Sequence, residues 1–98
     1  MKETTEKPLF VPLKREWFKA FQSGDKSEEY RPHGPRWNER TCKIGRRVTL
    51  CLGYGKKHRL SGIVASFRVE INTEKIKGWR ECYGTRPDPA ACIGIKLT

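Results

Sequence analysis

The sequence lacks any long hydrophobic run. No apolar stretch in its 98 residues approaches the roughly 20 residues that a membrane-spanning helix needs. The first seven residues, MKETTEK, are polar and do not form the apolar core of a secretory signal peptide. Internal repeats and low-complexity tracts are also missing, which argues against repeat architectures. We therefore expect a cytoplasmic protein with no membrane contact. Its N-terminus should be loose over residues 1–7, followed by a single domain over residues 8–98.

The sequence also lacks the paired cysteines of zinc ribbons and zinc fingers. Its four cysteines are Cys42, Cys51, Cys82 and Cys92. No two of them form a C-x-x-C pair, and the two histidines are too isolated to complete a metal site. Without a secretory signal, a disulfide framework is not expected either. The spacing predicts four reduced thiols, some of them in the core, and no metal or other cofactor.

Acidic residues are scarce in the middle of the chain. Residues 1–30 hold six basic and six acidic side chains, whereas residues 31–59 hold nine basic ones against Glu39 alone. Such a focused basic segment attracts polyanions, and interleaved aromatic rings can stack on bases. The segment therefore indicates nucleic acid or a nucleotide as partner; the alternative is a solvated basic face that only favours solubility. The residues of this segment that we expect to bind are Arg31, Arg36, Trp37, Arg40, Arg46, Arg47, Tyr54, Lys56 and Lys57.

Alternating apolar residues predict most of the strands. Pro12 removes a backbone donor, so the first strand should lie at a sheet edge or break there. Segments 46–54 and 59–71 flank the turn GYGKKH and predict an antiparallel hairpin. In the second of these, apolar residues alternate from Ile63 to Ile71, and Gly62 is expected to mark a bulge that corrects the phase of Leu60. The predicted strands span residues 8–14, 26–31, 46–54, 59–71 and 91–98, with a turn at 85–90.

Two short helices complete the expected fold. The first, at 15–23, places Trp17, Ala20 and Phe21 on one face. The second, at 73–84, has apolar residues at helical spacing. Five to six strands with two short helices predict an α+β fold, and strands of this length usually curl into a small β-barrel or a strongly bent sheet.

The stretch GDKSEEYR follows the first predicted helix directly. Its spacing is G-x-K-x-x-E-x-R, filled by Gly24, Lys26, Glu29 and Arg31, and Gly45 precedes the next strand. This arrangement over residues 9–71 resembles the ASCH domain family. The resemblance implies a PUA-like β-barrel with flanking helices, and a cleft where the motif meets the basic segment. It also implies RNA binding, and some family members act on nucleic acid or nucleosides.

The motif residues also have a physical interpretation. Gly24 lets the chain leave the helix sharply, so Lys26 should emerge at the lip of the barrel, facing a ligand. A lysine there can hold a phosphate, or act as base or nucleophile if it is desolvated. Glu29 and Arg31, two apart on a strand, project from one side, so Arg31 can pair with Glu29 or with a phosphate. The alternative is an ordinary charged strand with surface ion pairs.

Several functions remain open at this point. We expect first an RNA- or nucleotide-binding module that uses Lys26, Glu29, Arg31 and the basic segment. One family branch resembles an amidohydrolase of acetylated cytidine, with lysine, threonine and a distant glutamate at work, but here Glu29 stands at the threonine position. If the chain is an enzyme, Lys26 and Glu29 are the candidate catalytic residues. Candidates for the distant acid are Glu70, Glu74 and Glu81. A ribonuclease-like hydrolase and an adaptor for an acidic protein partner are further alternatives.

Overall fold

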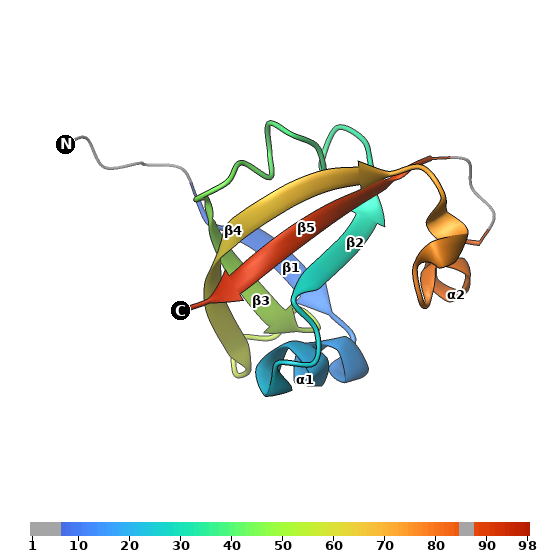
Figure 1. Cartoon of the computed structure of the whole chain (residues 1–98). Coiled ribbons are helices and arrows are strands. Elements are labelled where there is room, and N and C mark those ends of the chain that lie inside the picture. Colours follow the sequence, from blue (N-terminus) through green and yellow to red (C-terminus); the bar gives the residue numbers. More distant parts are fainter. Residues whose placement is uncertain (1–6, 85–87) are drawn as a thin grey trace.

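The computed structural model describes residues 7–84 and 88–98 (Figure 1). Within these residues, five strands form one curled sheet in the order β1-β3-β4-β5-β2, with two short α-helices beside it. The elements are β1 (Leu9–Leu13), α1 (Arg15–Ser23), β2 (Glu28–Pro32), β3 (Arg47–Leu52), β4 (Arg59–Glu70), η1 (Thr73–Lys75), α2 (Trp79–Tyr83) and β5 (Ala90–Leu97). The predicted α+β class is confirmed: the sheet is a half-barrel, consistent with a small PUA-like barrel.

Two expectations fall on parts of the chain that the structure does not describe. The loose N-terminus predicted for residues 1–7 lies outside the described residues except for Lys7. The first half of the turn predicted at 85–90 lies outside them as well. None of the helices in the described ranges is long and apolar enough to cross a membrane.

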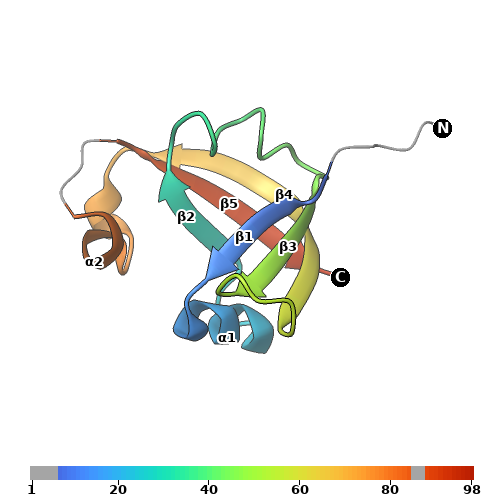
Figure 2. The same cartoon turned by 180° about the vertical axis from the view of Figure 1, so that it is seen from behind.

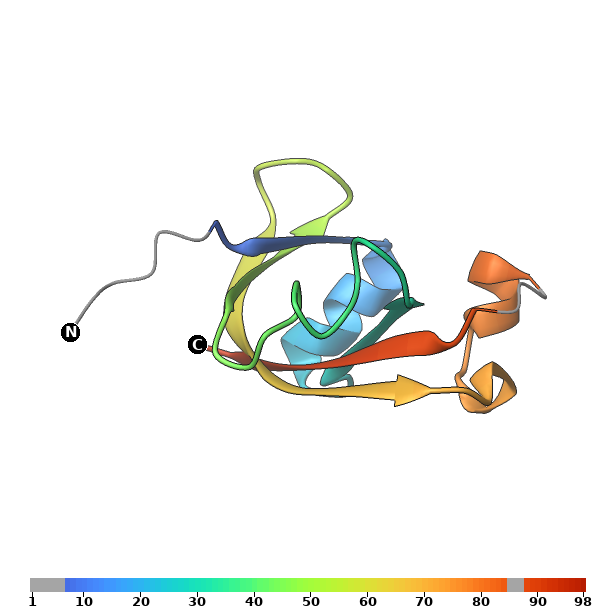
Figure 3. The ribbon, with the colours of Figure 1, turned by 90° about the horizontal axis from the view of Figure 1, so that it is seen from above.

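The pairing of the strands leaves β1 and β2 at the two edges of the sheet. β3 and β4 form the predicted antiparallel hairpin, β5 pairs antiparallel with both β4 and β2, and β1 pairs in parallel with β3. Pro12 thus lies in an edge strand, as its missing backbone donor requires. Seen from above (Figure 3), the sheet curves until β1 lies over β5, with α1 at one end of the half-barrel and the loop between β2 and β3 at the other. The same arrangement is visible from behind (Figure 2).

The core fills the inside of this curve. Alternation places apolar residues of the strands inward, and the largest fully buried strand side chains include Val11, Val48, Leu50, Val64 and Ile93. In α1 the buried side chains are Phe18 and Phe21, with Trp17 packed against them in part. The predicted helix face was therefore incomplete, because it omitted Phe18.

The predicted phase of β4 is wrong in its first half. Leu60 and Val64 pack in the core, and the register shift lies between Val64 and Ser66 rather than at Gly62. Gly62 has a different role: a Cβ there would lie 2.6 Å from the carbonyl oxygen of Lys96, so glycine permits the close approach of β5. Beyond the bulge Phe67 still packs against the core, as the alternation predicts, but Val69 and Ile71 do not: they are 44% and 85% exposed.

The second predicted helix is shorter than expected. Residues 73–75 form a single 3₁₀ turn, and α2 begins only after Gly78. Gly78 has φ of 84°, a left-handed conformation that interrupts a helix and changes the direction of the chain. The break lets α2 fold back toward the edge strands, beside the half-barrel (Figure 1). There Trp79 packs with Tyr30, Cys92 and Tyr83 in a second small apolar cluster.

Candidate functional site

A cavity of about 300 Å³ lies between the two edge strands and α2. Three parts of the chain line it, which are far apart in sequence: the end of β1 with the start of α1, the motif segment, and the segment around α2. Its volume falls at the lower end of the roughly 300–1,000 Å³ that is typical of small-molecule sites. The motif residues Lys26, Glu29 and Arg31 all line it, so the cavity is the candidate functional site.

Glu29 is the centre of the polar cluster in this cavity. Its Oε2 accepts a hydrogen bond of 2.8 Å from Arg31 Nε, and its Oε1 lies 3.6 Å from Lys26 Nζ. The side chain of Glu29 is only 9% exposed. One buried carboxylate is thus shared by two cations, which compensates its charge and leaves the cluster with a net positive charge. The strand spacing explains the geometry, because Glu29 and Arg31 project from the same side of β2.

Arg31 also joins the cluster to the opposite edge of the sheet. Its Nη2 donates a hydrogen bond of 2.6 Å to the carbonyl oxygen of Pro12 in β1. Its guanidinium carbon lies 4.9 Å from the centre of the Trp37 ring. The guanidinium therefore uses its planar fork and its flat face together, which a lysine at this position cannot do.

Lys26 does not stand exposed at the lip of the barrel, as the sequence suggested. Its side chain is 14% exposed, and Nζ lies 4.6 Å from the ring centre of Tyr30, 5.2 Å from that of Trp17 and 5.6 Å from that of Phe21. Burial lowers the pKa of Lys26, and the Glu29 carboxylate opposes that shift. The ammonium group is held by aromatic faces and one carboxylate, so truncation to alanine would remove packing as well as charge.

Aromatic side chains from two elements form much of the rest of the lining. Tyr30 comes from β2, and Trp79 and Tyr83 come from α2, with their ring centres 4.6 Å apart. The Tyr83 hydroxyl donates a hydrogen bond of 3.5 Å to the carbonyl oxygen of Tyr30, which ties α2 to the motif strand. Trp79 Nε1 is buried without a hydrogen-bond partner among the described residues. The sequence does not predict that α2 lies at the site, because the spacing of aromatic residues in 76–83 does not indicate which strand the helix packs on.

Tyr30 faces a second network on the other side of β2. Its hydroxyl donates a hydrogen bond of 2.9 Å to Glu28, which in turn accepts two hydrogen bonds from Arg68. Burial, with help from the hydrogen bond to Glu28, raises the pKa of Tyr30 to about 12. The tyrosine is therefore a neutral hydrogen-bond donor at any physiological pH, which makes it a positioning group rather than a base.

Of the three candidates for a distant acid, Glu81 is the one that lines the cavity. Glu70 does not line the cavity; its carboxylate accepts a hydrogen bond from Arg68 on β4. Glu74 lies in the 3₁₀ turn outside this cavity. If the site is catalytic, Glu81 is accordingly the acid that the fold brings to the motif.

The basic segment is not part of the cavity lining, Arg31 excepted. Trp37 is 8% exposed and belongs to the core, and the guanidinium groups of Arg31 and Arg36 lie over its ring. Little of the ring is therefore open to a base, contrary to the stacking role expected for it. Arg46 donates hydrogen bonds to the carbonyl oxygens of Lys7 and Thr41, so it holds the loop to the start of β1.

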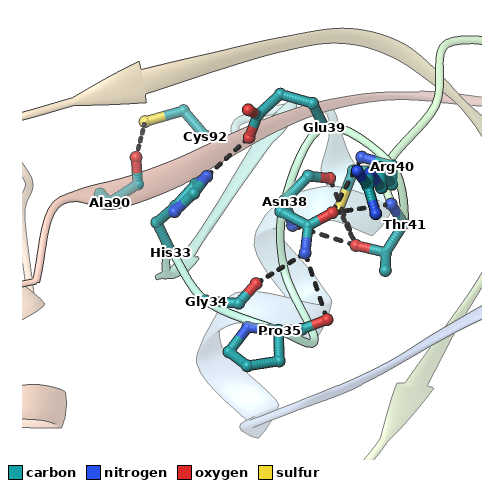
Figure 4. Close-up of polar contacts among 10 residues, drawn as sticks. His33, Gly34, Pro35, Asn38, Glu39, Arg40, Thr41, Ala90 and Cys92 are labelled. Carbon is teal, nitrogen blue, oxygen red and sulfur yellow. Dashed lines mark hydrogen bonds and ion pairs between the residues drawn. The ribbon is translucent and has the colours of Figure 1, made fainter.

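The loop that carries Trp37 is held by Asn38 (Figure 4). The Oδ1 of Asn38 accepts hydrogen bonds from the backbone of Arg40 and Thr41, and its Nδ2 donates to the carbonyl oxygens of Gly34 and Pro35. The one side chain of Asn38 thus binds backbone carbonyl groups before it and backbone N–H groups after it, which stabilises the tight turn. Arg40 is presented on the outside of this turn and is exposed.

The remaining predicted binding residues lie on the surface. Tyr54 is 80% exposed, and Arg47, Lys56 and Lys57 are exposed as well. All of the predicted binding residues are in the described ranges, and of these only Lys26, Glu29 and Arg31 line the cavity. The structure therefore divides the predicted site into an enclosed cluster and a separate basic surface.

The four cysteines are free thiols. Cys42, Cys51 and Cys92 are buried, and burial raises the pKa of both Cys42 and Cys92. Cys82 is exposed and lines the cavity, which makes it a natural reporter of occupancy. In residues 7–84 and 88–98, no group of three or more His, Cys, Asp or Glu side chains is placed to hold a metal ion.

The chain was then compared with known proteins. No model of a known protein family matches the chain, and no curated protein matches it.

Proposed function

We propose that the chain is an RNA- or nucleotide-binding module of the ASCH type, and that one nucleotide occupies the cavity beside the motif. The observation that carries this proposal is the composition of one small cavity. It combines the Lys26–Glu29–Arg31 cluster with the rings of Trp17, Tyr30 and Tyr83. Flat rings favour a planar ligand, and a carboxylate beside two cations offers both an acceptor and donors to the edge of a base.

The mouth of the cavity fits the charged part of such a ligand. Lys14 and Lys77 line it and are both exposed. An exposed lysine can turn its ammonium group toward a phosphate, whereas Lys26 is held by its own rings and by Glu29. We therefore assign the base to the enclosed cluster and the phosphate to the two lysines at the mouth. A cavity of about 300 Å³ excludes a duplex, so the bound nucleotide is free or unstacked.

Tryptophan fluorescence gives a direct test, because Trp17 and Trp79 line the cavity. The parent chain and a Lys26→Met variant are titrated with the four mononucleotides and with a short single-stranded RNA. Methionine keeps much of the packing and removes the charge. We expect Lys26→Met to weaken binding at least tenfold, while Lys75→Met, at an exposed lysine outside the cavity, binds like the parent.

Alkylation of Cys82 provides an independent readout of the same site. A ligand in the cavity should slow the modification of this exposed thiol, and the three buried thiols serve as internal controls. If no nucleotide or RNA binds the parent, or if Lys26→Met binds like the parent, the proposal is wrong. A partner that is an acidic protein would differ by its weaker dependence on salt, since release of counterions from a polyphosphate gives a steep, log-linear loss of affinity.

A second candidate function is hydrolysis of a modified nucleoside or of RNA. One observation favours it: Lys26 has a pKa lowered by burial, which increases the fraction of neutral amine that can act as a base or nucleophile. Glu29 and Glu81 are the acids beside it. Incubation with acetylated cytidine, and separately with single-stranded RNA, tests this function. Product must form with the parent and be lost with Lys26→Met.

A further inference from the structure

A second aromatic and basic feature lies outside the cavity, on the turn between β3 and β4. The ring of Tyr54 packs at 33° against the ring of Phe10 from β1, with 6.2 Å between the ring centres. The guanidinium carbon of Arg59 lies 5.8 Å from the centre of the Phe10 ring. We call Phe10, Tyr54 and Arg59 the platform. Its rings are accessible, since Tyr54 is 80% exposed and Phe10 is only partly buried.

The turn that carries Tyr54 also carries basic residues. Lys56 and Lys57 lie in the same turn, and both are exposed. Residues 40–69 contain eight basic side chains and no acidic one. A negatively charged chain therefore meets no repulsive carboxylate from this part of the sequence. Exposed rings with basic neighbours are the features by which proteins hold single-stranded nucleic acid, where bases stack on rings and phosphates meet cations.

The platform and the cavity meet along β1. Phe10 and Pro12 are two residues apart and lie on the same face of the strand, and Pro12 lines the cavity. Two residues along a strand span roughly 7 Å. The turn is fixed at the same point, because the backbone of Gly53 donates a hydrogen bond of 2.9 Å to the carbonyl oxygen of Leu13, which also lines the cavity. Figure 2 shows this turn beside the end of β1 and α1.

From this continuity we infer that the platform stacks the nucleotide next to the one in the cavity. The ligand is then a single-stranded nucleic acid rather than a free nucleotide. This inference rests on the proposed function, which it makes more specific. Phosphates between the two bases pass the exposed Lys14 at the mouth of the cavity, and those beyond Tyr54 meet Lys56 and Lys57. Double-stranded nucleic acid does not fit, because its bases are not free to stack on a ring.

Tyr54 contributes little to the stability of the fold. A side chain that is 80% exposed contributes little apolar burial, and its variants should therefore fold normally. Replacement of Tyr54 separates the platform from the cavity without touching a cavity residue. Phenylalanine at this position keeps the ring, whereas serine removes it.

The test compares two ligands and three variants. A mononucleotide and a short single-stranded pyrimidine RNA are titrated against the parent, Tyr54→Ser, Tyr54→Phe and Lys26→Met, with melting temperatures as a check on folding. We expect Tyr54→Ser to bind the RNA roughly tenfold more weakly, the loss typical of one base–ring stack. It should bind the mononucleotide like the parent, and Tyr54→Phe should bind both ligands like the parent.

Two results would overturn the platform: RNA binding by Tyr54→Ser equal to that of the parent, or an equal loss for RNA and mononucleotide. Failure of the proposed function would give a different result. In that case the parent binds no mononucleotide, or Lys26→Met binds it as tightly as the parent does, whatever the result for Tyr54→Ser. If Lys26→Met leaves mononucleotide binding unchanged while Tyr54→Ser still weakens RNA binding, the platform acts by itself and its coupling to the cavity is wrong.

Discussion

Arg31 and Pro12 are joined by a hydrogen bond of 2.6 Å between the guanidinium Nη2 and the carbonyl oxygen. The two residues belong to the two edge strands of the sheet, β2 and β1, which do not pair with each other. A side chain thus spans the gap where a closed barrel would have backbone hydrogen bonds. The same guanidinium binds Glu29, so the opening of the half-barrel and the polar cluster are held by one group.

Replacing Arg31 by lysine tests this bridge. Lysine keeps the charge but lacks the planar fork, so it cannot serve Glu29 and the Pro12 carbonyl at once. We expect a loss of about 1–3 kcal/mol in the free energy of unfolding, the usual result of leaving a shielded polar group without its partner. Urea denaturation measures it. Arg36→Lys is the matched control, because Arg36 also lies over Trp37 but is exposed; equal losses in both variants would refute the bridge.

Glu29→Gln should be more damaging than its small change in shape suggests. The substitution leaves Lys26 and Arg31 close together without the carboxylate that they share. Breaking a buried ion pair by removing one partner costs roughly 3 kcal/mol, so both melting temperature and ligand binding should fall. Glu16→Gln changes an exposed carboxylate on α1 and should be nearly silent. Thermal melts of the two variants decide, and a stable Glu29→Gln protein would show that the cluster is not coupled.

Tyr30 predicts a pH dependence in the alkaline range. Its pKa is raised from 10.0 to about 12 in the folded chain, so between these values the unfolded chain releases the proton first. The free energy of unfolding should therefore decrease as pH rises from 10.0 to about 12. Tyr30→Phe lacks this contribution and should lose less stability over the same range, whereas Tyr54→Phe should follow the parent. Denaturant titrations at several alkaline pH values measure the difference, and parallel curves for all three proteins would contradict the assignment.

Gly78→Ala tests how α2 is placed over the cavity. Gly78 has φ of 84°, and a Cβ there would lie 3.1 Å from Cζ2 of Trp17. An alanine must adopt a left-handed conformation, which costs roughly 1–2 kcal/mol, and must also displace the tryptophan ring. We expect a lower melting temperature and an altered tryptophan emission spectrum. Gly34→Ala is the control, because a Cβ at Gly34 meets nothing within 4 Å and its φ is not positive; matching effects in the two variants would exclude the Trp17 contact.

The basic surface predicts a specific salt dependence of RNA binding. Arg46 is unsuitable for charge reversal because its guanidinium binds two backbone carbonyls. Reversal of Arg47, Lys56 and Lys57 should weaken binding, and each lost phosphate contact should reduce the slope of log affinity against log salt by about 0.7 for a single strand. The matched set is Lys19, Lys75 and Lys96, which are exposed elsewhere. Equal effects of the two sets would show that only total charge matters.

The sequence by itself determined the elements that depend on neighbours along the chain. Alternation places Leu9, Val11 and Leu13 inward whatever surrounds them, because side chains of a strand point to opposite faces in turn. Gly24 ends α1 with φ of 89°, a left-handed conformation that favours glycine at the C-terminus of a helix. The spacing of Glu29 and Arg31 likewise fixes their common side of β2. These are local relations, and local chemistry is sufficient to predict them.

The tertiary structure decided what depends on distant partners. The inward face of β4 follows from its pairing with β5 and from the bulge after Val64, which no alternation within β4 reveals. Trp37 is a core residue only because the loop folds over the end of the half-barrel, although its basic neighbours suggested a base-stacking role. The cavity exists because α2 turns at Gly78 and packs on the motif strand. Burial of Lys26 follows from that packing and from α1, so its lowered pKa is a property of the fold and not of the motif.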